Sequence, residues 1–139
     1  MTKARLAAAL MAALVASACG GPVSPSNNVD EPPFSGSVQP FSFGPIHTFN
    51  VPNLGEMTVT VTSITPGNTF LGVLYGQPAG NACGVIQSNI VSSSNLGRTA
   101  LSGSIIIKGQ YCVQVFDPVN SVGAPLSLPQ NYTLQVRHP

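Results

Sequence analysis

The sequence predicts an all-β protein with a single β-sandwich of about eight strands. Apolar and polar residues alternate within its short apolar runs, which is typical of strands with one buried face. Turn-forming residues separate these runs roughly every eight to twelve positions, as they do in sandwiches. The chain has 14 glycines and 13 prolines but only 6% charged residues. This composition favours an exported β protein over a helical cytosolic enzyme.

Eight runs carry the strand pattern. The clearest is 56–62, where Met57, Val59 and Val61 alternate with threonines. The run 69–75 is apolar on both faces, which predicts a central strand. The predicted strands cover 38–43, 46–51, 56–62, 69–75, 83–91, 99–107, 109–117 and 132–136.

Aromatic residues are assigned mainly to the core. Phe41, Phe43, Phe49 and Val51 fall at alternate positions on either side of a Gly-Pro break, and we expect all four to be buried. The tyrosines could instead form a sugar-stacking platform, but their alternating apolar neighbours favour core packing. They are Tyr75, Tyr111 and Tyr132.

Residues 1–18 have the features of an export signal. A positive start is followed by an apolar run over 6–15 and by small residues over 16–18, as at a cleavage site. The stretch Ala16-Ser17-Ala18-Cys19 resembles the lipobox of bacterial lipoproteins, in which the cysteine becomes the lipidated first residue. That resemblance implies a lipid anchor at Cys19. The alternative is an ordinary signal peptide cut after residue 18, which leaves a free cysteine.

The segment 19–37 is rich in proline, serine and asparagine and is predicted to be a disordered tether. Such a tether would hold the folded domain, predicted over 38–139, away from the membrane. The alternative is a tail with no role. Gly20 after the cysteine resembles lipoproteins directed to the outer membrane, so we expect a cell-envelope protein that is periplasmic or surface-exposed.

Charge argues against nucleic acid as a partner. Without the two basic residues of the signal, three basic residues remain against four acidic ones, for a net charge of −1. No basic patch is left for phosphate groups. We expect no metal or other cofactor, because the acidic residues are spread along the chain.

Four motifs carry a resemblance to a known family. They are Phe49-x-Val51 and the runs 57–61 (MTVTV), 109–115 (GQYCVQV) and 132–136 (YTLQV). Together they resemble bacterial pre-peptidase C-terminal (PPC) domains over roughly residues 39–139. The resemblance implies a non-catalytic, jelly-roll-like sandwich, for which roles in polysaccharide or substrate binding and in secretion have been proposed. Thr69 stands where many members have an aspartate, so we do not expect this chain to have the calcium site that some members have.

Cys83 and Cys112 are predicted to form a disulfide. With Cys19 lipidated, they are the two cysteines left in an oxidising compartment. Closing a loop of this length stabilises a fold by about 3 to 4 kcal/mol. The alternatives, a metal site or a nucleophile, lack a nearby histidine or carboxylate.

His47 and His138 are the histidines on which catalysis would depend. A Ser–His–Asp triad would need one of them beside Asp117 or Asp30. His47 shares a face with Phe49, which favours packing, and His138 is expected to fray beside the C-terminus. We therefore predict a protein that is not an enzyme. The alternatives are a small secreted hydrolase using one of these histidines and a purely structural envelope protein.

The long loop 117–130 is the predicted place for a ligand site, because loops on rigid sandwiches carry binding functions. Its polar candidates are Asp117, Asn120 and Ser121. We expect a binding or interaction module whose ligand is a polysaccharide or a protein. The membrane is its second partner, through the lipid anchor at Cys19.

Overall fold

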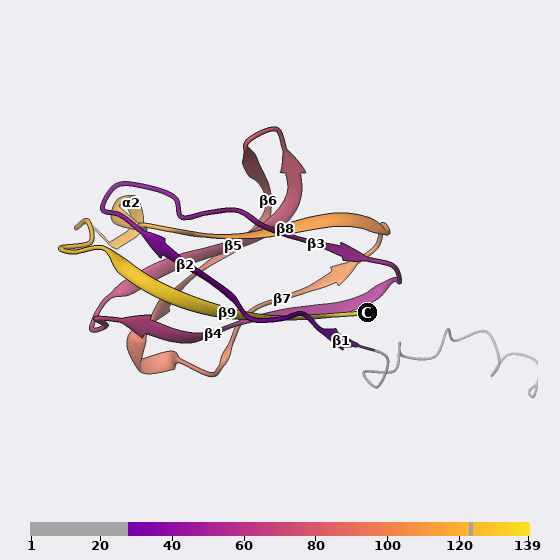
Figure 1. The fold of residues 1–139 in the computed structure, drawn as a ribbon, viewed down its shortest axis with the longest axis horizontal. Helices are drawn as coiled ribbons and strands as arrows, with labels where there is room; N and C mark the ends of the chain where they lie inside the picture. The colour runs from indigo at the N-terminus through magenta and orange to yellow at the C-terminus, as the bar shows by residue number, and fades with distance from the viewer. Residues whose placement is uncertain (1–27, 123) are drawn as a thin grey trace, which may run out of the picture.

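The computed structural model describes residues 28–122 and 124–139, and these residues form a two-layered β-sandwich (Figure 1). The predicted signal peptide and Cys19 lie outside the described residues. Within them, nine strands form two antiparallel sheets, and helical structure is limited to two short turns. The predicted all-β sandwich is confirmed.

The chain follows a jelly-roll path. Sheet A has the order β1–β9–β4–β7, with β2 also paired to β9, and sheet B has the order β3–β8–β5–β6. From β2 to β9 the chain changes sheet at every connection except the β5–β6 hairpin, as in jelly rolls. The elements are β1 Val29–Asp30, β2 Phe34–Val38, β3 His47–Val51, β4 Gly55–Thr65, β5 Phe70–Ala79, β6 Ala82–Ser92, η2 Ser93–Asn95, β7 Thr99–Ile105, β8 Gly109–Phe116, α2 Val119–Val122 and β9 Gln130–His138.

Alternate strand residues fill the core between the sheets. Met57, Val59 and Val61 of β4 are buried, as the period of two predicts. The three tyrosines are buried as well, so their assignment to the core is confirmed. The same alternation buries Phe49, Val51, Val113, Val115, Leu134 and Val136.

Strand β5 lies in the middle of sheet B, between β8 and β6, which confirms the central position predicted from its apolar faces. Leu71 and Val73 point into the sandwich. Its other face also carries apolar contacts, because Leu74 packs there in a second cluster. The members of that cluster are Leu74, Cys83 and Cys112, with Ile46 and Phe116 packed against them. The outer face of sheet B is therefore partly apolar.

The β5–β6 hairpin bends away from sheet B and stands above it in Figure 1. The bend follows a register shift between Tyr75 and Gly76. A side chain on Gly76 would overlap the backbone carbonyl of Gly84, so only glycine allows this approach. The bend brings Cys83 to Cys112 on β8, with 5.8 Å between their Cα atoms. The predicted disulfide is confirmed, and it ties the hairpin to sheet B.

The folded domain begins earlier than the predicted boundary at residue 38. Strand β1 pairs with the end of β9, Val29 opposite His138, and β2 pairs with the beginning of β9, Phe34 opposite Leu134. Paired backbone groups stabilise these polar strands without a large apolar content. Phe34 adds a stacked contact on His47, with ring centroids 5.0 Å apart. The tether prediction for 19–37 is therefore wrong from Val29 onward.

Candidate ligand groove

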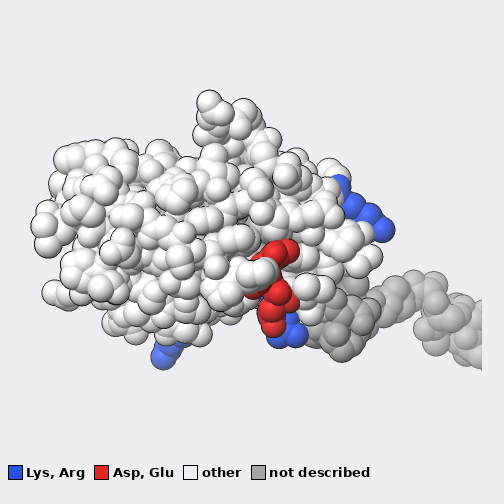
Figure 2. All heavy atoms as spheres, viewed as in Figure 1, with Lys and Arg blue, Asp and Glu red and all other residues white. Residues whose placement is uncertain are grey.

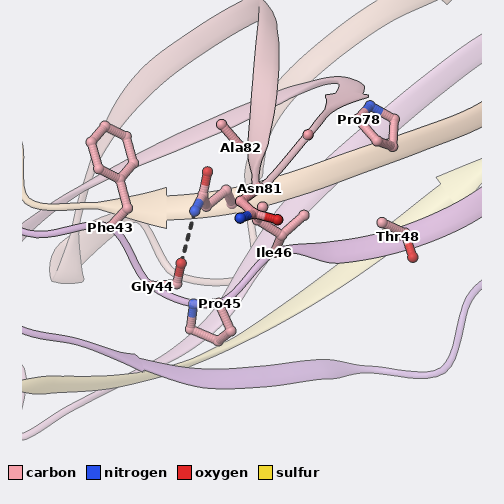
Figure 3. A pocket seen from close by; sticks show the side chains of 10 residues that line it. Phe43, Gly44, Pro45, Ile46, Thr48, Pro78, Asn81 and Ala82 are labelled. Atoms are coloured by element: carbon pink, nitrogen blue, oxygen red, sulfur yellow. Dashed lines mark hydrogen bonds between the residues drawn. The ribbon is translucent and has the colours of Figure 1, made fainter.

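The outer face of sheet B is hollowed between the 43–48 segment and the tip of the β5–β6 hairpin. The hollow is a groove of about 620 Å³ (Figure 3). Figure 3 shows the hairpin tip at Asn81 and Ala82 beside the segment that carries Phe43 and Ile46. The groove is lined by Phe43, Gly44, Pro45, Ile46, Thr48, Pro78, Gly80, Asn81, Ala82 and Gln114.

None of the described residues that line the groove carries a charge. Its polar lining consists of amides, a hydroxyl and backbone groups, with Gln114 already donating from Nε2 to the Gly44 carbonyl at 2.8 Å. In the view of Figure 2, in which the β5–β6 hairpin rises in profile, charged side chains form only small groups away from that hairpin. A groove of this kind suits an uncharged ligand, because a charged ligand would lose hydration without gaining a partner.

Two phenylalanines stand exposed at one end of the groove. Phe41 is 73% exposed and Phe43 is 63% exposed, so their predicted burial is wrong. The strand predicted over 38–43 is wrong as well, because β2 ends at Val38. Pro40 and Pro45 bracket this stretch, and proline interrupts the pairing of a strand. The alternation of Phe41 and Phe43 therefore does not continue a strand in the core.

Backbone hydrogen bonds fix the segment that presents these rings. Gly44 donates its N–H to the Val115 carbonyl at 2.8 Å, and Asp117 donates its N–H to the Ser42 carbonyl at 3.0 Å. Phe41 has φ of 57°, the left-handed region, which is uncommon for a bulky residue. Strain of this kind concentrates at binding sites and requires support from its surroundings.

Asp117 supplies part of that support. Its Oδ2 accepts the N–H of Phe41 at 2.7 Å and the N–H of Leu126 at 3.1 Å. The carboxylate is buried, and its Oδ1 has no hydrogen-bond partner among the described residues. Asp117 thus holds the loop and the Phe41 turn together.

The other two predicted ligand residues lie beside Asp117. Asn120 and Ser121 are exposed on α2 and line a second hollow of about 350 Å³. Phe41 and Phe43 line the same hollow, and Phe43 also lines the groove. The structure therefore brings all three predicted residues to one place, next to two phenylalanines that the sequence analysis assigned to the core. The paired prolines around Phe41 and Phe43 are the signal that indicates their exposure.

The histidines lie at the edge of the sandwich. His138 is buried, stacks on Phe49 and contacts Glu31 through Nε2 at 2.9 Å, so the prediction that it frays is wrong. Its order follows from β9, which continues through His138 because β1 pairs there. His47 is hydrogen-bonded to Tyr132 at 3.2 Å, and burial lowers the pKa of its ring. Among the described residues, neither histidine contacts a serine or aspartate through a hydrogen bond.

In 28–122 and 124–139, no group of three His, Cys, Asp or Glu side chains is placed to hold a metal ion. No helix in that part of the chain is long and apolar enough to cross a membrane. No protein-family model, curated protein or solved structure matches this chain. The resemblance to PPC domains thus rests on the sequence motifs.

Proposed function

We propose that this chain is a non-catalytic lipoprotein of the bacterial cell envelope, and that its sandwich binds an uncharged polysaccharide in the groove. The observation that carries the proposal is the pair of exposed rings, Phe41 and Phe43. Backbone hydrogen bonds hold the segment that presents them, and that segment lies beside an uncharged groove. Aromatic rings provide apolar faces on which sugar rings pack.

The groove supports a polymer better than a small molecule. It is open along the surface, and the hollow beside Asn120 continues it past Phe43. Amide and hydroxyl groups along this path, including Asn81, Thr48 and Ser121, match the hydroxyl groups of a sugar chain. A rigid surface binds with a smaller loss of conformational entropy than a mobile loop does.

The lipoprotein part rests on the lipobox-like stretch that ends in Cys19. A lipid anchor would keep the groove at the cell envelope, where polysaccharides are abundant. Replacing Cys19 by Ser tests this part alone. We expect the variant to leave the membrane fraction for the soluble exported fraction.

Affinity electrophoresis in gels containing neutral polysaccharides tests the ligand class. We expect retardation of the wild type, and little retardation of Phe43→Ala. The matched control is Phe70→Ala, because Phe70 is also an exposed ring, at 50%, but lines neither the groove nor the adjoining hollow. Equal retardation of all three proteins would contradict the proposal. If a protein from a cell extract binds the wild type but not Phe43→Ala, and no polysaccharide does, the ligand of the groove is a protein instead.

A further inference from the structure

The opposite end of the sandwich carries a separate apolar surface, which we call the isoleucine end. It consists of Leu54, Ile106 and Ile107. Ile106 is 77% exposed and Ile107 is 59% exposed, and Leu54 is exposed beside them. These residues lie at the β3–β4 and β7–β8 turns, which Figure 1 places together at the end where β1 and the C-terminus lie.

The backbone of the isoleucine end is held in place. The Tyr111 hydroxyl donates to the Ile107 carbonyl at 2.8 Å, and Ile105 pairs with Gly55 at the edge of sheet A. The connection from β7 in sheet A to β8 in sheet B is therefore held at both ends, and it projects two large apolar side chains into solvent. Large exposed apolar groups on a fixed turn indicate an interaction site rather than a frayed loop.

The chain enters the domain at this same end. Asn28 donates from Nδ2 to the Glu56 carbonyl at 2.9 Å, and Glu56 lies two residues from Leu54. Nine positions separate Asn28 from Cys19, which limits the distance between them to about 32 Å at full extension. A lipid on Cys19 would therefore keep the isoleucine end close to the bilayer.

We propose that the isoleucine end docks onto the bilayer in which Cys19 is anchored, and this inference rests on the lipid anchor proposed above. Isoleucine and leucine side chains partition into the boundary between headgroups and acyl chains. Because the anchor tethers the domain to the bilayer, docking is an intramolecular event with a high effective concentration. A small apolar patch is therefore sufficient for docking.

Charges around the isoleucine end are mixed rather than basic. Lys108 follows Ile107, whereas Glu56 and Asp30 lie nearby, with Asp30 paired to Arg137 at 3.8 Å. Apolar insertion therefore drives docking more than attraction to anionic lipid does. Figure 1 shows α2 at the other end of the sandwich, and Phe41 and Phe43 line a hollow together with α2 residues. Docking at the isoleucine end would therefore leave these rings facing away from the membrane.

The chain contains no tryptophan, so a single introduced tryptophan reports on one site. Ile107→Trp and Leu128→Trp form a matched pair, because the two side chains are 59% and 56% exposed. Ile107 lies in the β7–β8 connection at the isoleucine end, whereas Leu128 lies just before β9, which begins at the other end of the sandwich (Figure 1). Each full-length lipidated protein is purified from membranes and reconstituted into phosphatidylcholine vesicles. Its emission is then measured with and without phosphatidylcholine brominated near the headgroup.

Docking predicts that Ile107→Trp is blue-shifted and loses most of its emission to the brominated lipid, while Leu128→Trp stays red-shifted and unquenched. Two unquenched tryptophans on protein that floats with the vesicles would overturn docking and leave the anchor intact. Equal quenching of both would show contact without orientation and would also overturn it. A blue shift without quenching, together with a dimer by cross-linking, would assign the patch to a second copy instead. If the wild type carries no lipid by mass, the anchor fails, and docking fails with it.

Discussion

The Asp117 carboxylate accepts the backbone N–H of Phe41 at 2.7 Å, although 76 positions separate the two residues in the sequence. This hydrogen bond links the loop after β8 to the turn that presents an exposed aromatic ring. The same carboxylate oxygen accepts the N–H of Leu126. One buried side chain thus holds the turn at Phe41, which lines the hollow beside the groove, to the loop segment at Leu126.

Replacing Asp117 by Ala should destabilise the domain. The N–H groups of Phe41 and Leu126 would both lose their acceptor, and an unsatisfied buried donor costs about 1 to 3 kcal/mol. We expect the midpoint of thermal unfolding, followed by circular dichroism, to fall by about 10 °C or more. Ser121→Ala is the control, because its exposed side chain should be neutral. An Asp117→Ala variant that melts with the wild type would show that the carboxylate does not hold these segments.

Replacing Phe41 by Asn should stabilise the domain and weaken polysaccharide binding. Asn tolerates the left-handed conformation at φ of 57°, which costs other residues about 1 kcal/mol or more. The exposed ring gives up little burial, so the free energy of unfolding in urea should rise by about 0.5 to 1 kcal/mol. Phe43→Asn is the matched control and should show no such gain, because Phe43 does not have a positive φ. A lower free energy of unfolding for Phe41→Asn than for Phe43→Asn would refute the strain argument.

The Cys83–Cys112 disulfide closes a loop of 29 positions. Its removal should reduce stability by about 3 kcal/mol, because the unfolded chain regains the freedom of that loop. We expect Cys83→Ser and Cys112→Ser each to lower the melting temperature by more than about 10 °C. The double variant should be no worse than either single one. Additive losses would mean that the two side chains act independently.

His47 should make stability depend on pH. Burial lowers its pKa below 6.5 in the folded state, so near pH 6 the unfolded chain binds the proton more readily. The stability contribution of neutral His47 is therefore complete above about pH 7 and is lost as the pH falls below about 6.5 toward the lowered pKa. His47→Gln removes this group. Urea unfolding at several pH values should show a smaller loss on acidification for the variant, and identical curves would contradict the assignment.

The sequence predicts those parts of the fold that depend on local alternation. The threonine-valine pattern of 56–62 and the apolar faces of 69–75 each reappear as a strand with the expected burial, and the strand predicted over 109–117 is β8. The Cys83–Cys112 pairing is predicted from the number of cysteines and the expected oxidising compartment, and the bend at Gly76 brings the two residues together.

The errors arise where a contact is distant in sequence. Val29 and Phe34 form strands because β9 offers them a pairing edge, which their own composition does not reveal. His138 is buried because Phe49 and Glu31 meet it from other elements. Alternation alone placed Phe41 in the core, whereas the bond to Asp117 holds it in a turn at the surface. The candidate groove depends on such distant contacts and could not be located from the sequence.

The central claim, that the groove on sheet B binds an uncharged sugar chain, is tested most directly by amide chemical-shift mapping. The ¹⁵N-labelled mature protein with Cys19→Ser is titrated with soluble oligosaccharides of β-linked glucose and N-acetylglucosamine. We predict saturable shifts in 41–48, in the hairpin tip 78–82 and at Gln114, which are lost in Phe43→Ala. Saturable shifts confined to the isoleucine end, or no shifts with any of these sugars while a protein partner produces them in the groove, would contradict the account.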